Sequence, residues 1–181
     1  MKNPIKFSYQ IVQTGIARVE ISLDGSEVAF DATNHANPLY DLLNGMSGMI
    51  LNPAHLWGEE NQAWIEWYGE NGALRWVIST TDGESISIKL YRITDIFDDS
   101  GTEVVLEGTC KLNLFFYAVI KELDTMIKEM GLLNYSQKWQ KDEFPLTNFL
   151  FLKKQLIDKG VWELSKPDNT TLSMEMELLL G

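Results

Sequence analysis

Cysteine and histidine are nearly absent from this sequence of 181 residues, which contains one Cys and two His. Cys110 alone cannot form an internal disulfide, which is typical of a protein kept in a reducing compartment. His35 and His55 are separated by a predicted helix and lie far from Cys110, so the spacing of a zinc site is missing. The sequence therefore predicts no metal centre, and only a site assembled by folding from His35, His55 and an acidic residue stays open.

Long apolar runs and basic clusters are also missing. No stretch after Met1 is apolar enough for a signal peptide or a membrane span, so we expect a cytoplasmic protein without a membrane partner. Lys and Arg number 15 against 26 Asp and Glu, which gives a formal net charge of -11. The lysines are scattered, and a surface of this charge repels phosphate backbones. We therefore expect no nucleic-acid partner.

Catalytic and cofactor motifs are missing too. There is no Gly-x-Ser-x-Gly elbow, no phosphate-binding glycine loop and no dinucleotide fingerprint, so no cofactor is expected. The acidic stretch with Asp95, Asp98, Asp99 and Glu103 lacks the spacing of a calcium loop and predicts an acidic turn. Cys110 has no base beside it in the sequence and is expected to be a packed residue. The sequence thus favours a protein that is not an enzyme.

Alternation of apolar and polar residues is the clearest pattern present. In the first third, Phe7, Tyr9 and Ile11, then Val19, Ile21 and Leu23, then Val28 and Phe30 predict three antiparallel strands. A second meander of four strands is predicted between Trp64 and Leu106. Its turns are Asn71-Gly72, Asp82-Gly83 and the segment from Asp98 to Gly101. Short glycine-containing turns require antiparallel pairing, because parallel strands need long crossovers.

Helical periodicity appears in three places. Pro38 follows the N-cap candidate Asn37 and opens a helix to Ile50, and Pro145 opens another that stops at Gly160. The strongest stripe runs from Leu112 to Met130 and buries Phe116, Val119, Leu123 and Ile127, so we expect this helix to lie across the four-stranded sheet. Alternation in 172–178 predicts a final strand. We expect one α+β domain spanning residues 1–181, mainly an antiparallel β-sheet meander with about three helices packed on it.

Tryptophan is the one residue type in excess. Six tryptophans occur, and Trp57, Trp64, Trp67 and Trp76 lie within one short stretch. Trp is enriched at interface hot spots, so these residues are candidates for a binding surface, with Asp98 and Asp99 as acids at its rim. Glu66 shares a strand face with Trp64 and Tyr68, opposite Ile65 and Trp67, and either face can be the inner one.

The second half of the chain resembles a known family. The shared features are Arg75-Trp76, the stretch 107–112, the helix ending at Met130-Gly131, Tyr135, Trp139, Phe144-Pro145 and the stretch 152–156. Over residues 64–157 this pattern resembles a family of small uncharacterised bacterial cytosolic proteins, and its general type is similar to the immunity proteins of bacterial polymorphic-toxin systems. That resemblance implies an acidic, aromatic-rich α+β domain without catalytic residues.

Two functions follow as hypotheses. The first is a non-enzymatic protein-binding module, an immunity-like or antitoxin-like protein that covers a basic toxin partner by charge and aromatic contacts. The alternative is a small-molecule-binding protein or hydrolase with a cleft between sheet and helices, using Glu66 and one of the two histidines. A deep pocket with convergent polar groups would favour the alternative, whereas a shallow acidic surface would favour the first.

Overall fold

Strands form two antiparallel sheets in the computed structural model, which describes residues 5–98, 101–165 and 169–180. The first sheet has the order β1-β2-β3, and the second has the order β4-β5-β6-β7. The strands of the first sheet are β1 (Lys6–Gln13), β2 (Ile16–Leu23) and β3 (Ser26–Thr33). Those of the second are β4 (Asn61–Gly69), β5 (Gly72–Thr80), β6 (Ser85–Ile93) and β7 (Thr102–Lys111). Both predicted meanders and the α+β class are confirmed.

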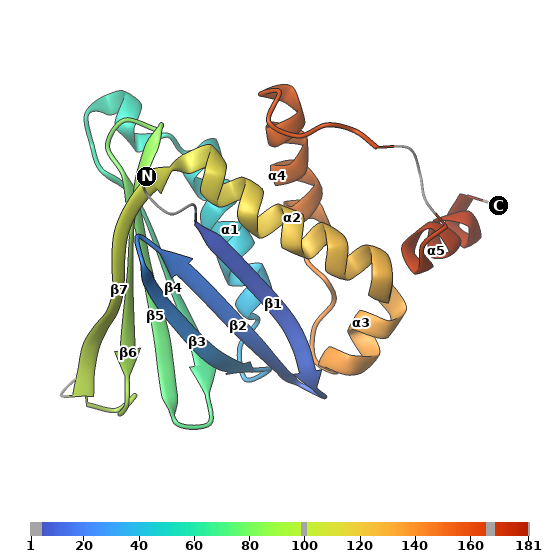
Figure 1. Cartoon of the computed structure of the whole chain (residues 1–181), viewed down its shortest axis with the longest axis horizontal. Coiled ribbons are helices and arrows are strands. Elements are labelled where there is room, and N and C mark those ends of the chain that lie inside the picture. The colour runs from blue at the N-terminus through green and yellow to red at the C-terminus, as the bar shows by residue number, and fades with distance from the viewer. Residues whose placement is uncertain (1–4, 99–100, 166–168, 181) are drawn as a thin grey trace.

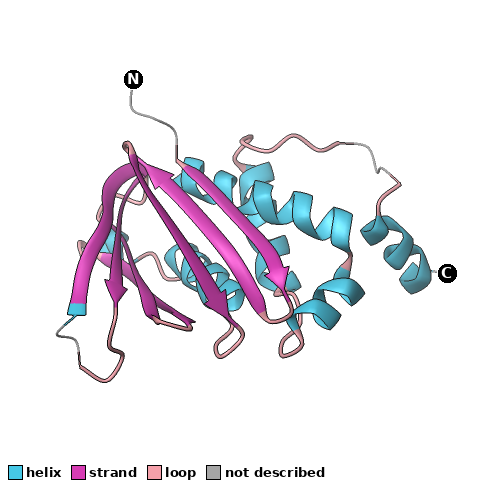
Figure 2. Cartoon of the chain, turned by 60° about the horizontal axis from the view of Figure 1, so that its bottom comes forward, coloured by secondary structure: helices cyan, strands magenta, loops and turns pink. Residues whose placement is uncertain are grey.

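The two sheets share one hydrophobic core. Their inner faces meet where the ring of Phe7 in β1 lies edge-on to Trp76 in β5, with 6.5 Å between the ring centroids. β3 contacts both β4 and β7, the edge strands of the second sheet, so the first sheet crosses over the second. Figure 2 shows the strands gathered on one side and most of the helical mass on the other. The inner face of the second sheet is thereby covered, and among the described residues no helix covers its other face (Figure 1), which we call the open face.

Five α-helices are present in the described residues, two more than predicted. They are α1 (Pro38–Leu51), α2 (Leu112–Met130), α3 (Leu132–Trp139), α4 (Leu146–Asp158) and α5 (Thr171–Leu180), with a short 3-10 helix, η1 (Ala54–Trp57), before β4. Helix α1 packs on β4, and α4 packs on both α1 and α2. Within these residues, no helix has the length and apolar character needed to cross a membrane.

Helix α2 begins and ends where the sequence predicts, but its position differs. Phe116, Val119, Leu123 and Ile127 are buried as expected. The helix lies along β1 of the first sheet, and its main contact with the second sheet is at β7 (Figure 1), so the prediction that it crosses the four-stranded sheet is wrong. The reason is that β7 continues directly into α2, which leads the chain away from the second sheet towards the uncovered edge of β1.

The predicted final strand is also wrong, because residues 171–180 form helix α5. The alternation there is short, and Leu, Met and Glu are strong helix formers. Helix α5 packs on α2, and its Glu175 carboxylate accepts hydrogen bonds from the backbone N–H groups of Leu132 at 2.5 Å and Leu133 at 3.0 Å. Helix α3 begins after Gly131, which has no capping side chain, so Glu175 supplies the missing acceptor.

Two glycines of α1 make a matched test of its packing on β4. A Cβ on Gly48 would meet nothing within 4 Å, whereas one on Gly45 would lie 3.1 Å from Ile65 Cδ1 and 3.2 Å from Ala63 Cβ. Gly48→Ala should therefore raise the free energy of unfolding by about 0.5–1 kcal/mol, the usual gain in a helix interior. Gly45→Ala should not show this gain in the free energy of unfolding, because its Cβ would crowd Ile65 and Ala63. Urea unfolding of both variants checks the difference, and equal gains would contradict the close α1–β4 packing.

Candidate functional site

The tryptophans predicted as a binding surface separate into two groups. Trp67 and Trp76 are 0% exposed and their rings pack at a tilt, with 4.9 Å between the centroids, so they fill the core and cannot contact a partner at the surface. Trp57 in η1 is 84% exposed and Trp64 in β4 is 65% exposed. Because side chains alternate along β4, Trp64 lies on the open face of the second sheet, opposite to Trp67.

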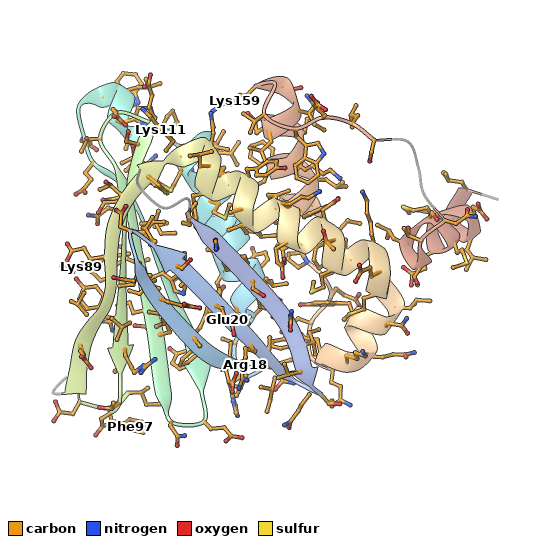
Figure 3. All side chains as sticks on the ribbon, in the orientation of Figure 1. Arg18, Glu20, Lys89, Phe97, Lys111 and Lys159 are labelled. Carbon is orange, nitrogen blue, oxygen red and sulfur yellow. The ribbon has the colours of Figure 1, made fainter. Side chains whose placement is uncertain are left out.

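The open face carries ordered pairs of side chains across its strands. One row of neighbouring side chains crosses all four strands. It consists of Trp64 in β4, Val77 in β5, Lys89 in β6 and Glu107 in β7. The Lys89 ammonium lies 3.3 Å from the Glu107 carboxylate. In the part of the chain that the structure describes, the five α-helices lie on the other side of this sheet (Figure 1), and Lys89 points outward from it (Figure 3). Trp64 is therefore the large apolar side chain of an uncovered surface.

Glu66 belongs to the same face and is held by its neighbours. Its Oε1 accepts a hydrogen bond of 2.6 Å from Arg75 Nε, and its Oε2 accepts one of 3.0 Å from the Tyr68 hydroxyl. The bond to the Glu66 carboxylate raises the pKa of Tyr68, because the phenol proton is shared with an anion. Glu66 is thus a fixed, charge-paired residue beside Trp64 on the open face of the second sheet.

A groove of about 390 Å³ runs between β4 and α1 next to this face. The β4 side chains of Gln62, Trp64 and Glu66 line one wall, and the other wall includes Asp41 and Gly48 of α1. Asn61 fixes the end of the groove, because its Nδ2 donates to the backbone oxygens of Met49 and Asn52, both at 3.1 Å. The groove is shallow and lined mainly by polar groups and by the helix backbone at its glycines.

Two acids, Asp41 and Glu66, line this groove. Glu66 is paired with Arg75, whereas Asp41 has no ion-pair partner among the described residues. Burial, and then repulsion by Asp142, raises the pKa of the Asp41 carboxyl. The folded protein therefore holds the carboxyl proton of Asp41 more tightly than the unfolded chain does. The resulting stabilisation is complete below the ordinary carboxyl pKa and is lost as the pH rises through the raised value.

Neutralising Asp41 should remove this pH dependence. Asp41→Asn should become more stable relative to the wild type as the pH rises through the raised pKa. Asp31 is the matched control, because Arg18 donates to both of its oxygens at 2.8 Å and lowers its pKa. Asp31→Asn should therefore lose stability relative to the wild type above the ordinary carboxyl pKa, and this difference should vanish at low pH. Urea unfolding between about pH 3 and 8 measures both, and the same pH trend in both variants would contradict the assignment.

Two larger hollows lie at the end of the second sheet, on either side of the β4–β5 turn. One, of about 550 Å³, is lined by residues that include the paired Arg18 and Asp31. The other, of about 780 Å³, is lined by His35, Tyr68 and the exposed Ile96 and Phe97. Figure 3 shows Phe97 at the tip of the β6–β7 loop. Asp98 is exposed next to it, and Asp99 lies outside the described residues.

The remaining candidates for chemistry are dispersed. Among the described residues, no three His, Cys, Asp or Glu side chains come together as metal ligands. His35 Nδ1 lies 2.8 Å from the Thr33 hydroxyl, and His55 packs on Gly83 in the β5–β6 turn. Cys110 is half-buried in β7. His35 and Glu66 line different hollows, so the structure does not bring together the acid and this histidine of the alternative hypothesis.

Sequence reasoning missed several residues of the open face and groove. Arg75, Lys89 and Tyr91 follow from the β4–β5–β6 register, which the short turns could have supplied. Asp41 could not be found in this way, because nothing local indicates that α1 lies beside β4. No family model, no curated protein and no solved structure matches this chain at a significant level.

Proposed function

We propose that this chain is a non-enzymatic protein-binding module, and that the open face of the second sheet around Trp64 binds its partner. The observation that carries this proposal is the exposure of Trp64 on an uncovered sheet face, while Trp67 on the same strand is buried. A large indole left in water beside ordered polar pairs is the typical composition of an interface hot spot with its rim.

The partner is expected to be basic. The chain carries a formal net charge of -11. On the open face, the cations Arg75 and Lys89 are each paired with an acid, Glu66 and Glu107, so these four residues add no net positive charge that would repel a basic partner. Complementary charge accelerates encounter, and a buried aromatic anchor slows release. An immunity-like role, in which the chain covers a basic toxin domain, is one form of this proposal.

Site-specific cross-linking in cells that express the chain tests the proposal. A photoreactive amino acid in place of Trp64 should capture one basic protein. The same amino acid in place of Gln10, which is exposed on the outer face of the first sheet, should not capture it. The captured protein, once purified, should bind the unmodified chain, and its binding should weaken as salt is raised. Capture from both positions, or from neither, would contradict this function.

A further inference from the structure

The outer edge of β4 offers free backbone hydrogen-bonding groups. The β4–β5 hairpin closes with the pair Gly69 and Gly72 around a two-residue turn, and this closing pair exchanges hydrogen bonds. Hydrogen-bonded and non-hydrogen-bonded pairs alternate from there, so the backbone N–H and C=O groups of Gln62, Trp64 and Glu66 point away from β5. Among the described residues, no backbone or side-chain group pairs with these three on that side.

This edge differs from the opposite edge of the same sheet. β7 carries an irregularity at Val105, where the register with β6 shifts, and it bears Glu103, Glu107 and Lys111. Bulges and charged side chains are the common means by which proteins protect an edge strand from pairing. β4 keeps an uninterrupted register with β5 and has one charged side chain, Glu66, which is already paired with Arg75. Its edge is therefore the unprotected one.

The α1–β4 groove leaves space for a further strand beside this edge. Helix α1 packs beneath the inner side of β4, and a Cβ placed on Gly48 would meet nothing within 4 Å. A strand paired with β4 would place alternate side chains over Gly48 on one side and beside Trp64 on the other. The groove residues include the acids Asp41 and Glu66 and no lysine or arginine.

We propose that the edge of β4 binds an extended segment of a basic partner protein, which adds to the second sheet as a further antiparallel or parallel strand. The segment alternates apolar residues, which pack against Trp64 on the open face, with Lys or Arg residues, which lie along the α1 wall of the groove from Gly48 to Asp41. Backbone hydrogen bonds provide the pairing, and the alternating side chains provide the selectivity. This inference rests on the proposed function and names the part of the partner that is bound.

A synthetic peptide tests the proposal. The probe is a fluorescent eight-residue peptide of alternating Lys and Val, and its binding is measured by anisotropy with an otherwise identical Glu-Val peptide as the charge control. The Lys-Val peptide should bind and the Glu-Val peptide should not. Methylation of alternate backbone nitrogens of the Lys-Val peptide should weaken its binding about tenfold or more, because it removes N–H donors that pair with β4. In amide exchange by NMR, the Lys-Val peptide should protect Gln62, Trp64 and Glu66.

Two variants should block pairing at the edge of β4 while they keep Trp64. Gln62→Pro deletes an outward N–H that β5 does not use, whereas the matched Gln62→Ala keeps it. Gly48→Leu fills the groove at a position where a side chain has space, so the variant should fold. We expect Gln62→Pro and Gly48→Leu each to weaken binding about tenfold, and Gln62→Ala to bind within about threefold of the wild type. Circular dichroism confirms folding, and Gly48→Leu keeps the test decisive if Gln62→Pro fails to fold.

The outcomes separate this inference from the proposed function. Absence of Lys-Val binding to the wild type, or equal binding by Gly48→Leu, would overturn strand addition at β4. If cross-linking from position 64 still captured a basic partner in that case, the protein-binding function would hold, but the partner would bind in a way other than strand addition. If sedimentation showed a wild-type dimer that Gln62→Pro abolished, the occupant would be a second copy of this chain, and a basic partner segment would be excluded.

Discussion

Replacing Phe116 by alanine should lower the free energy of unfolding by about 3–5 kcal/mol, the usual cost of truncating a buried aromatic side chain. Phe116 is 1% exposed in α2, and its ring lies edge-on to Phe115 with 6.1 Å between the centroids. Its removal leaves a cavity where α2 packs against the body of the protein. Urea unfolding followed by fluorescence measures the loss.

Leu114 on the same helix is the matched control. It is exposed, so Leu114→Ala removes little buried surface and should change the free energy of unfolding by less than about 0.5 kcal/mol. A loss below about 1 kcal/mol for Phe116→Ala would mean that this side of α2 faces water, and the arrangement of α2 along β1 would be wrong.

Asp124→Ala should be nearly as damaging for a different reason. The Asp124 carboxylate is buried in α2, where it accepts a hydrogen bond from Lys153 of α4 and lies 2.9 Å from Lys128 Nζ. Lys153 is itself largely buried, with its Nζ 4.8 Å from the centroid of the Trp162 ring. Removing the carboxylate leaves this ammonium without its anion, which costs about 3–5 kcal/mol in known buried pairs.

Two controls separate the buried pair from charge in general. Asp158→Ala removes an exposed partner of Lys154 on α4 and should change stability by less than about 0.5 kcal/mol. The double variant Asp124→Leu with Lys153→Met leaves no unpaired charge and should regain most of the loss. If Asp124→Ala proved no worse than Asp158→Ala, the ion pair would not connect α2 to α4.

The strands and turns were predictable because their signals are local. Period-two alternation from Val19 to Leu23, and the glycine turn at Gly72, decide pairing between neighbouring segments without reference to the rest of the chain. Gly72 has a φ of 119°, and a Cβ there would lie 2.0 Å from the Ile93 oxygen, so a glycine is required at this position. Strand order within each meander follows from such turns, and both meanders are confirmed.

The arrangement of elements was less predictable because it depends on contacts between distant residues. Nothing near α2 indicates that β1, which lies near the other end of the chain, offers the edge along which it packs. The tail was mistaken for a strand because the alternation of Met174, Glu175 and Met176 resembles one. The contacts of α5 with α2 and of Glu175 with the start of α3 are visible only in the folded protein.

Which of the candidate residues lie at the surface also depends on contacts between distant residues. Both faces of β4 carry tryptophan, so alternation separates Trp64 from Trp67 but does not decide which of the two is buried. That decision depends on the first sheet and α1, which cover the side with Trp67. The pairing of Glu66 with Arg75 follows once the hairpin register is known, whereas the α1–β4 groove could not be derived from sequence.

The dissociation rate of the partner captured from position 64 tests the central claim most directly. Surface plasmon resonance should show that Trp64→Ala raises this rate about tenfold or more, because an interface anchor acts mainly on release. Gln10→Ala, on the outer face of the first sheet, should leave the rate unchanged, and added salt should mainly slow association. An unchanged dissociation rate for Trp64→Ala would contradict the assignment of the open face of the second sheet as the binding surface.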